Sequence, residues 1–130
     1  MSRHNLFEIS DLTPRAGAER TQIETVEREL GCNLPEDYRT FLRTSNGLEG
    51  FVSSEAYLIL WPVQEIISLN TAYATAEFAP GLVLIGTNGG DTGYGIIVSQ
   101  TKFQYVRVPL IGMSLDMIEP MGDTIVDLVK

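Results

Sequence analysis

The sequence has very little of the chemistry that most catalytic and metal sites need. Its 130 residues include one cysteine, Cys32, and one histidine, His4. A single thiol excludes an intramolecular disulfide and a cysteine-based zinc site. A catalytic triad needs an imidazole that its surroundings hold in place, and His4 lies in a polar N-terminal stretch. These absences remove most hydrolase active sites and leave carboxylates as the only ligands for a metal.

Long hydrophobic runs are also missing. The longest, "AYLILWPV" and "LVLIG", are much shorter than the roughly 20 residues that a membrane-spanning helix needs. The first twelve residues, "MSRHNLFEISDL", lack the apolar centre of a secretion signal. We therefore expect a cytoplasmic protein that makes no contact with a membrane.

Basic residues are absent from the middle of the chain. No Lys or Arg lies between Thr44 and Thr101, whereas five acids do, and the formal net charge is −8. Such a charge repels nucleic-acid phosphates, whose binding depends on Lys and Arg, and it speeds encounter with a basic protein. The simpler alternative is that the charge only keeps the protein soluble.

The composition that is present suits one α+β domain. Apolar residues make up 44% of the chain and charged residues 20%, and 130 residues can bury one core but not two. We divide the chain into a polar lead at 1–18 and a single domain at 19–130. We expect an N-terminal helix pair packed with a mainly antiparallel sheet, a further helix between strands and a short C-terminal helix.

The helix pair is the clearest local pattern. Apolar residues at helical spacing predict a first helix over 15–31, closed by Gly31. The stretch "LGCNLPEDYRTFLRTSNG" at 30–47 then predicts a second helix. Pro35 suits its first turn, two acids follow at the positive end of the helix dipole, and Asn46-Gly47 ends it. Every residue of this stretch is explained by hinging and packing two helices, and none is left for catalysis.

Periodicity changes after residue 55. The run at 63–78 predicts a third, weaker helix, and "DTIVDLVK" at 123–130 predicts a short amphipathic helix with Asp123 as its cap. Residues 109–122 are expected to be irregular, with one short helical turn at most. Four strands are expected, at 56–61, 82–87, 94–99 and 103–108.

The order of these features resembles the SUKH superfamily, which includes a fungal regulator of cell-wall synthesis and many bacterial proteins that neutralise secreted toxins. The resemblance covers most of residues 20–100. It continues through the strand that ends in Trp61-Pro62, the strand "LVLIG" and the glycine-rich turn before Tyr94. Its most specific part is a set of ten residues in the family's order and spacing: Glu27, Leu30, Gly31, Leu34, Pro35, Tyr38, Phe41, Leu42, Asn46 and Gly47.

The resemblance implies an α+β domain without catalytic activity or cofactor that works by binding another protein. Bacterial relatives bind toxins, commonly nucleases, so the first hypothesis is an immunity-type protein with a basic toxin as its partner. A regulatory scaffold in cell-envelope synthesis or signalling is the second hypothesis. The third is a small-ligand binder that uses residues 87–95.

Residues 87–95, "TNGGDTGYG", look most like a ligand site. A phosphate loop needs a Lys after its glycines and a following helix, whereas here Asp91 follows and a strand is expected. A hairpin turn is the simpler interpretation, because Asn, Gly and Asp suit left-handed positions. Glu49, Glu55 and Asp91 would form an acidic mouth if their loops lie at the same end of the sheet. We therefore predict partner contact at Glu49, Glu55, Asn88, Asp91 and Tyr94, and no metal site.

Overall fold

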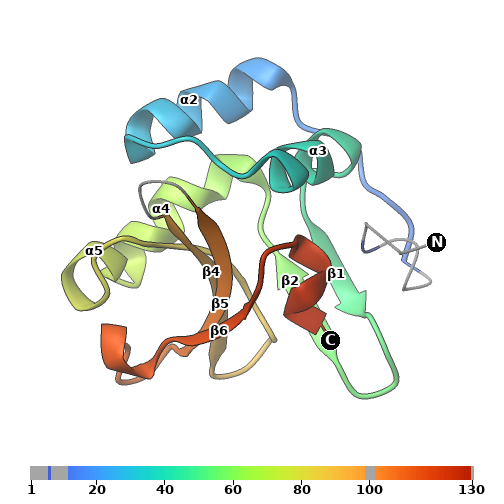
Figure 1. Ribbon diagram of the computed structural model, residues 1–130. Coiled ribbons are helices and arrows are strands. Elements are labelled where there is room, and N and C mark those ends of the chain that lie inside the picture. The colour runs from blue at the N-terminus through green and yellow to red at the C-terminus, as the bar shows by residue number, and fades with distance from the viewer. Residues whose placement is uncertain (1–5, 7–11, 99–101, 130) are drawn as a thin grey trace.

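The protein is a six-stranded antiparallel sheet with helices packed against it in the computed structural model, which describes residue 6 and residues 12–98 and 102–129 (Figure 1). The strands follow one another in the order β1-β2-β3-β4-β5-β6. The expected α+β class, with its N-terminal helix pair and antiparallel sheet, is confirmed. The strands are β1 (Leu48–Phe51), β2 (Tyr57–Leu60), β3 (Leu82–Thr87), β4 (Thr92–Val98), β5 (Phe103–Pro109) and β6 (Glu119–Gly122). The helices are α2 (Arg20–Leu30), α3 (Glu36–Thr44), α4 (Ile66–Ala72) and α5 (Thr75–Phe78), with 3₁₀ helices η1 (Val63–Glu65), η2 (Leu115–Met117) and η3 (Ile125–Val129).

Helix α2 begins later than its sequence predicts. We expected a start at residue 15, but the helix starts at Arg20, after a capping box in which the Glu19 N–H donates to the Gln22 side chain. The preceding residues are held against α3 instead, because the Ala18 N–H donates to the Leu42 carbonyl at 2.7 Å. A Cβ at Gly17 would clash with the carbonyl of Arg43. This close contact fixes 15–18 outside the helix.

The stretch 30–47 forms the predicted hinge between two helices. Leu34, Tyr38 and Leu42 are fully buried, and the buried carboxylate of Glu27 accepts the Leu34 N–H at 2.7 Å. The chain leaves α3 through Gly47, whose φ of 98° is left-handed. Leu34, Tyr38 and Leu42, on which part of the resemblance to the SUKH superfamily depends, are therefore residues of the hydrophobic core.

Two of the strands, β1 and β6, were not predicted. β1 and β6 have four residues each, and their glycines and the proline at 120 weaken the alternating pattern that identifies a strand. Both lie at the ends of the strand order, where fewer ladder hydrogen bonds are needed. β4 also begins two residues before its predicted start, at Thr92.

The third helix predicted over 63–78 is broken into three pieces. η1 leads into α4, and the chain then turns at Ala74, which has φ 54° and ψ 42°. Ala74 is the one residue other than glycine with a positive φ in the described chain. The break lets α5 run separately from α4, beside the start of β3 (Figure 1).

Two details of the C-terminal third also differ from expectation. Tyr105 and Val106 are both buried, although successive strand residues normally point to opposite faces, because the pairing of β5 with β6 shifts register between them. Asp123 does not cap the last helix. The Ile125 N–H donates instead to Asp37 of α3, at 2.8 Å. Asp37 also accepts the Tyr105 hydroxyl at 2.7 Å, so one carboxylate joins α3, β5 and η3.

The antiparallel order places three turns at one end of the sheet. These turns, at 52–56, 88–91 and 110–118, join β1 to β2, β3 to β4 and β5 to β6. We call this end of the molecule the loop end. Helices α2 and α3 lie away from it, at the top of Figure 1.

Candidate functional site

A half-exposed aromatic pair marks the ribbon that β1 and β2 form near the loop end. Phe51 and Tyr57 are cross-strand partners, with ring centroids 4.9 Å apart in an edge-to-face arrangement. The Tyr57 hydroxyl donates to Glu49 at 2.7 Å, and this bond, together with burial, raises the pKa of Tyr57. Phe51 is 60% exposed. The ribbon therefore presents an aromatic surface beside an ordered carboxylate.

The next turn, 88–91, packs against this ribbon and satisfies its own amides. The Asn88 side chain accepts the N–H groups of Gly90 and Thr92, and the Thr87 hydroxyl accepts that of Gly89. A Cβ at Gly89 would lie 3.1 Å from the Tyr57 ring, so turn and ring are in close contact. Since these amides bond within the turn, they are not directed outward as in a phosphate loop.

The acidic residues predicted to contact a partner share the loop end. Glu55 is exposed in the 52–56 turn, and Asp91 is exposed in the 88–91 turn. Asp91 also links to the third turn, because its carbonyl accepts the Leu110 N–H at 2.8 Å. Glu49 lies beside this region, because its carboxylate accepts the hydroxyl of Tyr57, the residue that follows the 52–56 turn. The condition for an acidic mouth, two loops at one end of the sheet, is met.

Tyr94 lies on the other face of the sheet. Ladder partners point to the same face, and Tyr94 pairs with Gly86 and Arg107, whereas Gly93 pairs with Thr87 and through it with Ile59. Tyr57 shares the face of Ile59 by two-residue alternation. Tyr94 is half-buried, and burial raises the pKa of its hydroxyl. The positive charge of Arg107 has a smaller, opposite effect on this pKa. It does not join the Phe51–Tyr57 surface.

The third turn carries exposed apolar side chains for which no partner contact was predicted. Ile111 is 85% exposed, and Leu115 and Met117 are each at least half exposed. Gly112, with φ 75°, turns the chain between the first two. We predicted only that this stretch is irregular; the signal in the sequence was a group of large apolar residues without helical or strand period. Three large exposed apolar residues within one turn make this turn a candidate contact surface.

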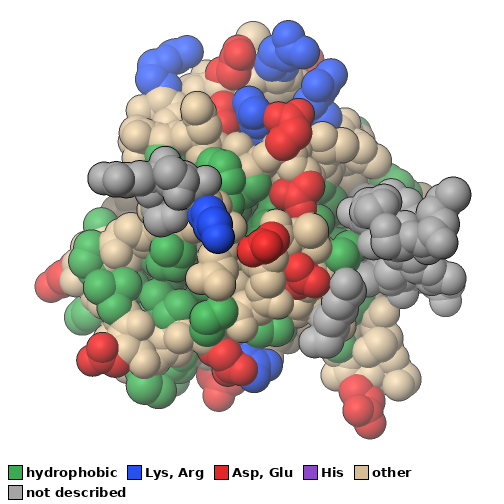
Figure 2. Space-filling view, viewed as in Figure 1, with side chains coloured by type: hydrophobic (Ala, Val, Ile, Leu, Met, Phe, Trp, Pro, Cys, Tyr) green, Lys and Arg blue, Asp and Glu red, His purple; other side chains and the backbone are tan. Residues whose placement is uncertain are grey.

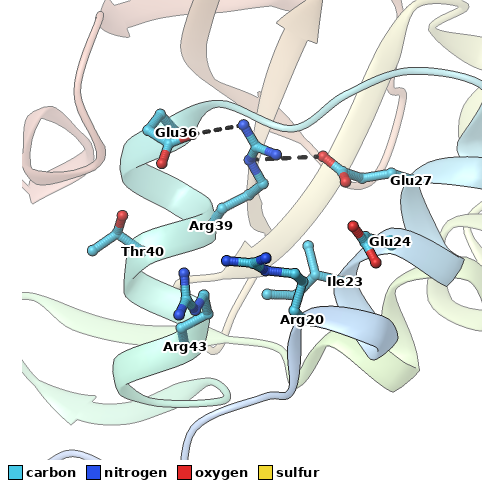
Figure 3. A pocket seen from close by; sticks show the side chains of 8 residues that line it. All are labelled: Arg20, Ile23, Glu24, Glu27, Glu36, Arg39, Thr40 and Arg43. Atoms are coloured by element: carbon cyan, nitrogen blue, oxygen red, sulfur yellow. Dashed lines mark hydrogen bonds and ion pairs between the residues drawn. The ribbon is translucent and has the colours of Figure 1, made fainter.

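Arginines gather at the opposite end of the molecule, in a recess between α2 and α3 (Figure 3). Arg39 bonds Glu36 at 2.6 Å and lies 3.9 Å from Glu27. Arg20 and Arg43 line the same recess. It has a volume of about 270 Å³ and equal numbers of arginines and glutamates. This arrangement ties the start of α3 to α2, which is a structural role.

The molecule is therefore electrically asymmetric. Figure 2 shows basic side chains gathered at the top, over α2 and α3, with acidic ones among them, and mostly acidic side chains with a few basic ones over the rest of this face. Residues 44–98 contribute five acids and no base. At the loop end, Arg107 is held in a two-bond ion pair by Glu119, at 2.8 Å for each bond. A basic partner would thus meet its favourable potential at the loop end rather than at the helix pair.

Among the described residues, no group of three His, Cys, Asp or Glu side chains could hold a metal ion. No helix in that part of the chain is long and apolar enough to cross a membrane. His4 lies outside the described residues.

Residues 17–127 match the family model described as the SMI1 / KNR4 family (SUKH-1). The chain belongs to this family. The match begins within the segment that packs on α3 and ends in η3, so it takes in all six strands.

Curated relatives match a shorter part of the SUKH-1 chain. F-box only protein 3 of Homo sapiens and that of Bos taurus are each 29% identical over 75 residues. The match covers 55% of this chain and 16% of each relative. The chain thus spans about a sixth of the length of these relatives, and the likeness concerns one segment of longer proteins.

Proposed function

We propose that this SUKH-1 protein is a non-catalytic binding protein of the immunity type, which neutralises a basic toxin domain by covering it. The observation that carries the proposal is the surface built by Phe51, Tyr57 and Glu49. It combines exposed aromatic area with fixed negative charge in a base-free part of the chain. Aromatic residues are enriched at protein interfaces, and complementary charge steers association.

The loop end extends this surface. Glu55 and Asp91 add charge from two turns, and Ile111 adds apolar area from the third. Apolar side chains surrounded by carboxylates complement a basic partner with an apolar depression. Tyr94 contributes less directly, because it lies on the opposite face.

Co-purification with the protein encoded beside this chain, followed by growth of a host expressing that protein, tests the proposal. We expect a stable complex and rescue of growth. Phe51→Ala and Tyr57→Phe should weaken the complex, the second by freeing Glu49. Raising NaCl from 50 to 500 mM should slow association more than dissociation. A captured partner that is acidic, or a complex indifferent to both substitutions, would refute this surface.

A regulatory scaffold is the second candidate. It is favoured by curated relatives in which the match covers only 16% of the chain, so that the matched segment is one part of a longer protein. Host growth separates the two: a scaffold binds its partner without rescuing growth from any toxic protein.

The small-ligand hypothesis for residues 87–95 loses its main support. The amides of Gly89, Gly90 and Thr92 already bond to side chains of the turn itself. Thermal unfolding with nucleotides, sugars and divalent metals checks this. A ligand at 100 times its dissociation constant would stabilise by about 2.7 kcal/mol, and we expect no shift.

A further inference from the structure

A second recognition feature lies at the end of the central strands β3 and β4 opposite the loop end, where α4 and α5 pack on the sheet. It is a groove of about 690 Å³ between the C-terminal end of α2, the two helices and the paired ends of β3 and β4. Figure 1 shows these elements together on one side of the molecule. The volume lies in the range of ligand sites and leaves room for a side chain with backbone on either side of it.

The groove is lined largely by aliphatic side chains. Leu30, Ile67, Leu82, Val83 and Val98 line it. Cys32 lines it too, and burial, with a smaller effect from the charge of Glu27, raises the pKa of its thiol. The thiol therefore stays neutral at ordinary pH. An apolar side chain packed against these residues would lose water on an uncharged surface.

Charge at the groove has a single sign. Glu29 and Glu77 are exposed residues of its lining, and no Lys or Arg lines it. A partner segment with an apolar side chain beside a positive charge therefore makes two favourable contacts, one with the aliphatic lining and one with Glu29 or Glu77. An acidic occupant would be repelled.

Two neighbouring residues of the groove lining are in energetically unfavourable local environments. Ala74 keeps a left-handed conformation that residues with a Cβ adopt only under constraint, and such strain is typical of ligand clamps. Next to it, the Thr75 hydroxyl is buried without a hydrogen-bond partner. A continuous helix over 63–78 would have removed the strain and the separate wall that α5 forms.

We propose that this groove binds an apolar side chain that a basic protein segment presents beside lysine or arginine. The proposal rests on the proposed function in one respect, the basic character of the partner. It adds a second contact, remote from Phe51 and Tyr57, and gives that contact a stated chemistry.

Short synthetic peptides test the chemistry without the natural partner. The probe is a capped pentapeptide with leucine between two lysines and glycine spacers; its controls replace leucine by alanine, or both lysines by glutamate. In NMR titrations we expect shifts of the amides of Ile67, Thr75 and Val98. The alanine peptide should bind about tenfold more weakly, from the apolar area it lacks. Equal affinity for the leucine and alanine peptides, or shifts confined to the loop end, would overturn the proposal.

Two matched pairs of variants test the groove itself. Ala76→Trp fills it from α5, whereas Ala72→Trp places the same side chain on an exposed position of α4 outside the lining. Glu77→Lys reverses the charge of a residue that lines the groove, whereas Glu65→Lys makes the same change at an exposed residue outside the lining. We expect Ala76→Trp and Glu77→Lys to lower the affinity for the leucine peptide by tenfold or more, and the two control variants to leave it unchanged. Thermal unfolding shows whether each variant is folded, and the wild-type titration stands if one is not.

The same variants separate this proposal from the proposed function. If the wild-type protein binds its natural partner and Ala76→Trp binds equally well, the groove proposal is overturned and the proposed function stands. If no partner binds wild type, the proposed function fails and the peptides still decide the groove. A change of oligomeric state on Ala76→Trp, seen in sedimentation without any peptide binding to wild type, would mean that a second copy fills the groove, which also overturns the proposal.

Discussion

At the scale of single residues, Asp37 joins segments that are far apart in the sequence. Its two carboxylate oxygens accept the Tyr105 hydroxyl and the Ile125 N–H, from partners 68 and 88 residues away in sequence. Both bonds involve an ionised acceptor, and such bonds contribute about 1.5–3 kcal/mol. Asp37 therefore holds the C-terminal helix to the body of the molecule.

Asp37→Asn should lower the free energy of unfolding by roughly 2–3 kcal/mol, because the amide is uncharged and offers one acceptor oxygen in place of two. Urea unfolding measures this. Asp123→Asn is the matched control, since Asp123 is exposed and does not cap η3; it should change stability by less than about 0.5 kcal/mol. Equal effects of the two changes would mean that Asp37 acts only through net charge.

Tyr105 adds a pH dependence at the same place. Burial, then the hydrogen bond to Asp37 and its charge, raise the pKa of the folded-state hydroxyl above the ordinary value of 10.0. A group whose pKa is raised on folding stabilises fully below its unfolded pKa, and this contribution is lost as pH rises above it. Unfolding free energies between pH 8 and pH 11.5 should therefore fall above about pH 10.

Tyr105→Phe should make that fall shallower. Tyr38 is also buried with a raised pKa, so part of the slope will remain. A slope identical in wild type and variant would show that Tyr105 ionises without cost in the folded protein.

At the scale of elements, Gly86 decides whether β2 can pair with β3. A Cβ there would clash with the carbonyl of Ile59 and lie 2.9 Å from a methyl of Leu60. β2 and β3 share only two registered pairs, so little pairing remains to absorb a displacement.

Gly86→Ala should destabilise the protein by more than about 2 kcal/mol through this overlap. Gly90→Ala is its control, because a Cβ there lies 3.4 Å from the Asn88 oxygen, an ordinary contact. Thermal unfolding of both variants measures the difference. If Gly90→Ala is equally harmful, backbone freedom rather than close packing explains the glycines of this region.

The elements also show how far the sequence predicts this fold. The helix pair and the buried strands follow from periodicity and from caps, since Leu34, Tyr38 and Leu42 recur at spacings of four. The break at Ala74 does not, because alanine is a strong helix former and its conformation is imposed from outside. Asn70 shows one such tertiary constraint: its side-chain amide bonds both the N–H and the carbonyl of Leu84, in place of a neighbouring strand.

The candidate site was predictable in part for the same reason. The acids of the loop end were recognised from charge alone, and antiparallel order brings their turns together. Phe51 and the apolar turn at 110–118 were missed, because exposure of a large apolar residue is a property of the folded surface. The groove was missed because it exists only where α5 separates from α4.

At the scale of the whole molecule, the negative charge is unevenly distributed. Residues 15–43 hold five of the nine Lys and Arg residues together with six acids, so this part is nearly neutral, whereas residues 44–98 hold five acids and no base. The described ion pairs join Arg39 to Glu27 and Glu36, and Arg107 to Glu119. Most remaining acids are exposed, so repulsion among like charges outweighs attraction over much of the surface.

Stability should consequently rise with salt, and location should matter more than net charge. Screening by 0.5 M NaCl should raise the free energy of unfolding by roughly 0.5–1 kcal/mol, the range of exposed charge interactions.

Glu55→Lys places a cation among acids, so the variant should be more stable than wild type at 20 mM NaCl and less sensitive to added salt. Glu24→Lys changes net charge equally but lies beside Arg20, Arg39 and Arg43 in the α2–α3 recess. It should therefore lose stability at low salt. Urea unfolding of the three proteins at both salt concentrations measures these effects. Identical behaviour of the two variants would mean that only the total charge counts, and the electrical asymmetry would then have no role in orienting a basic partner.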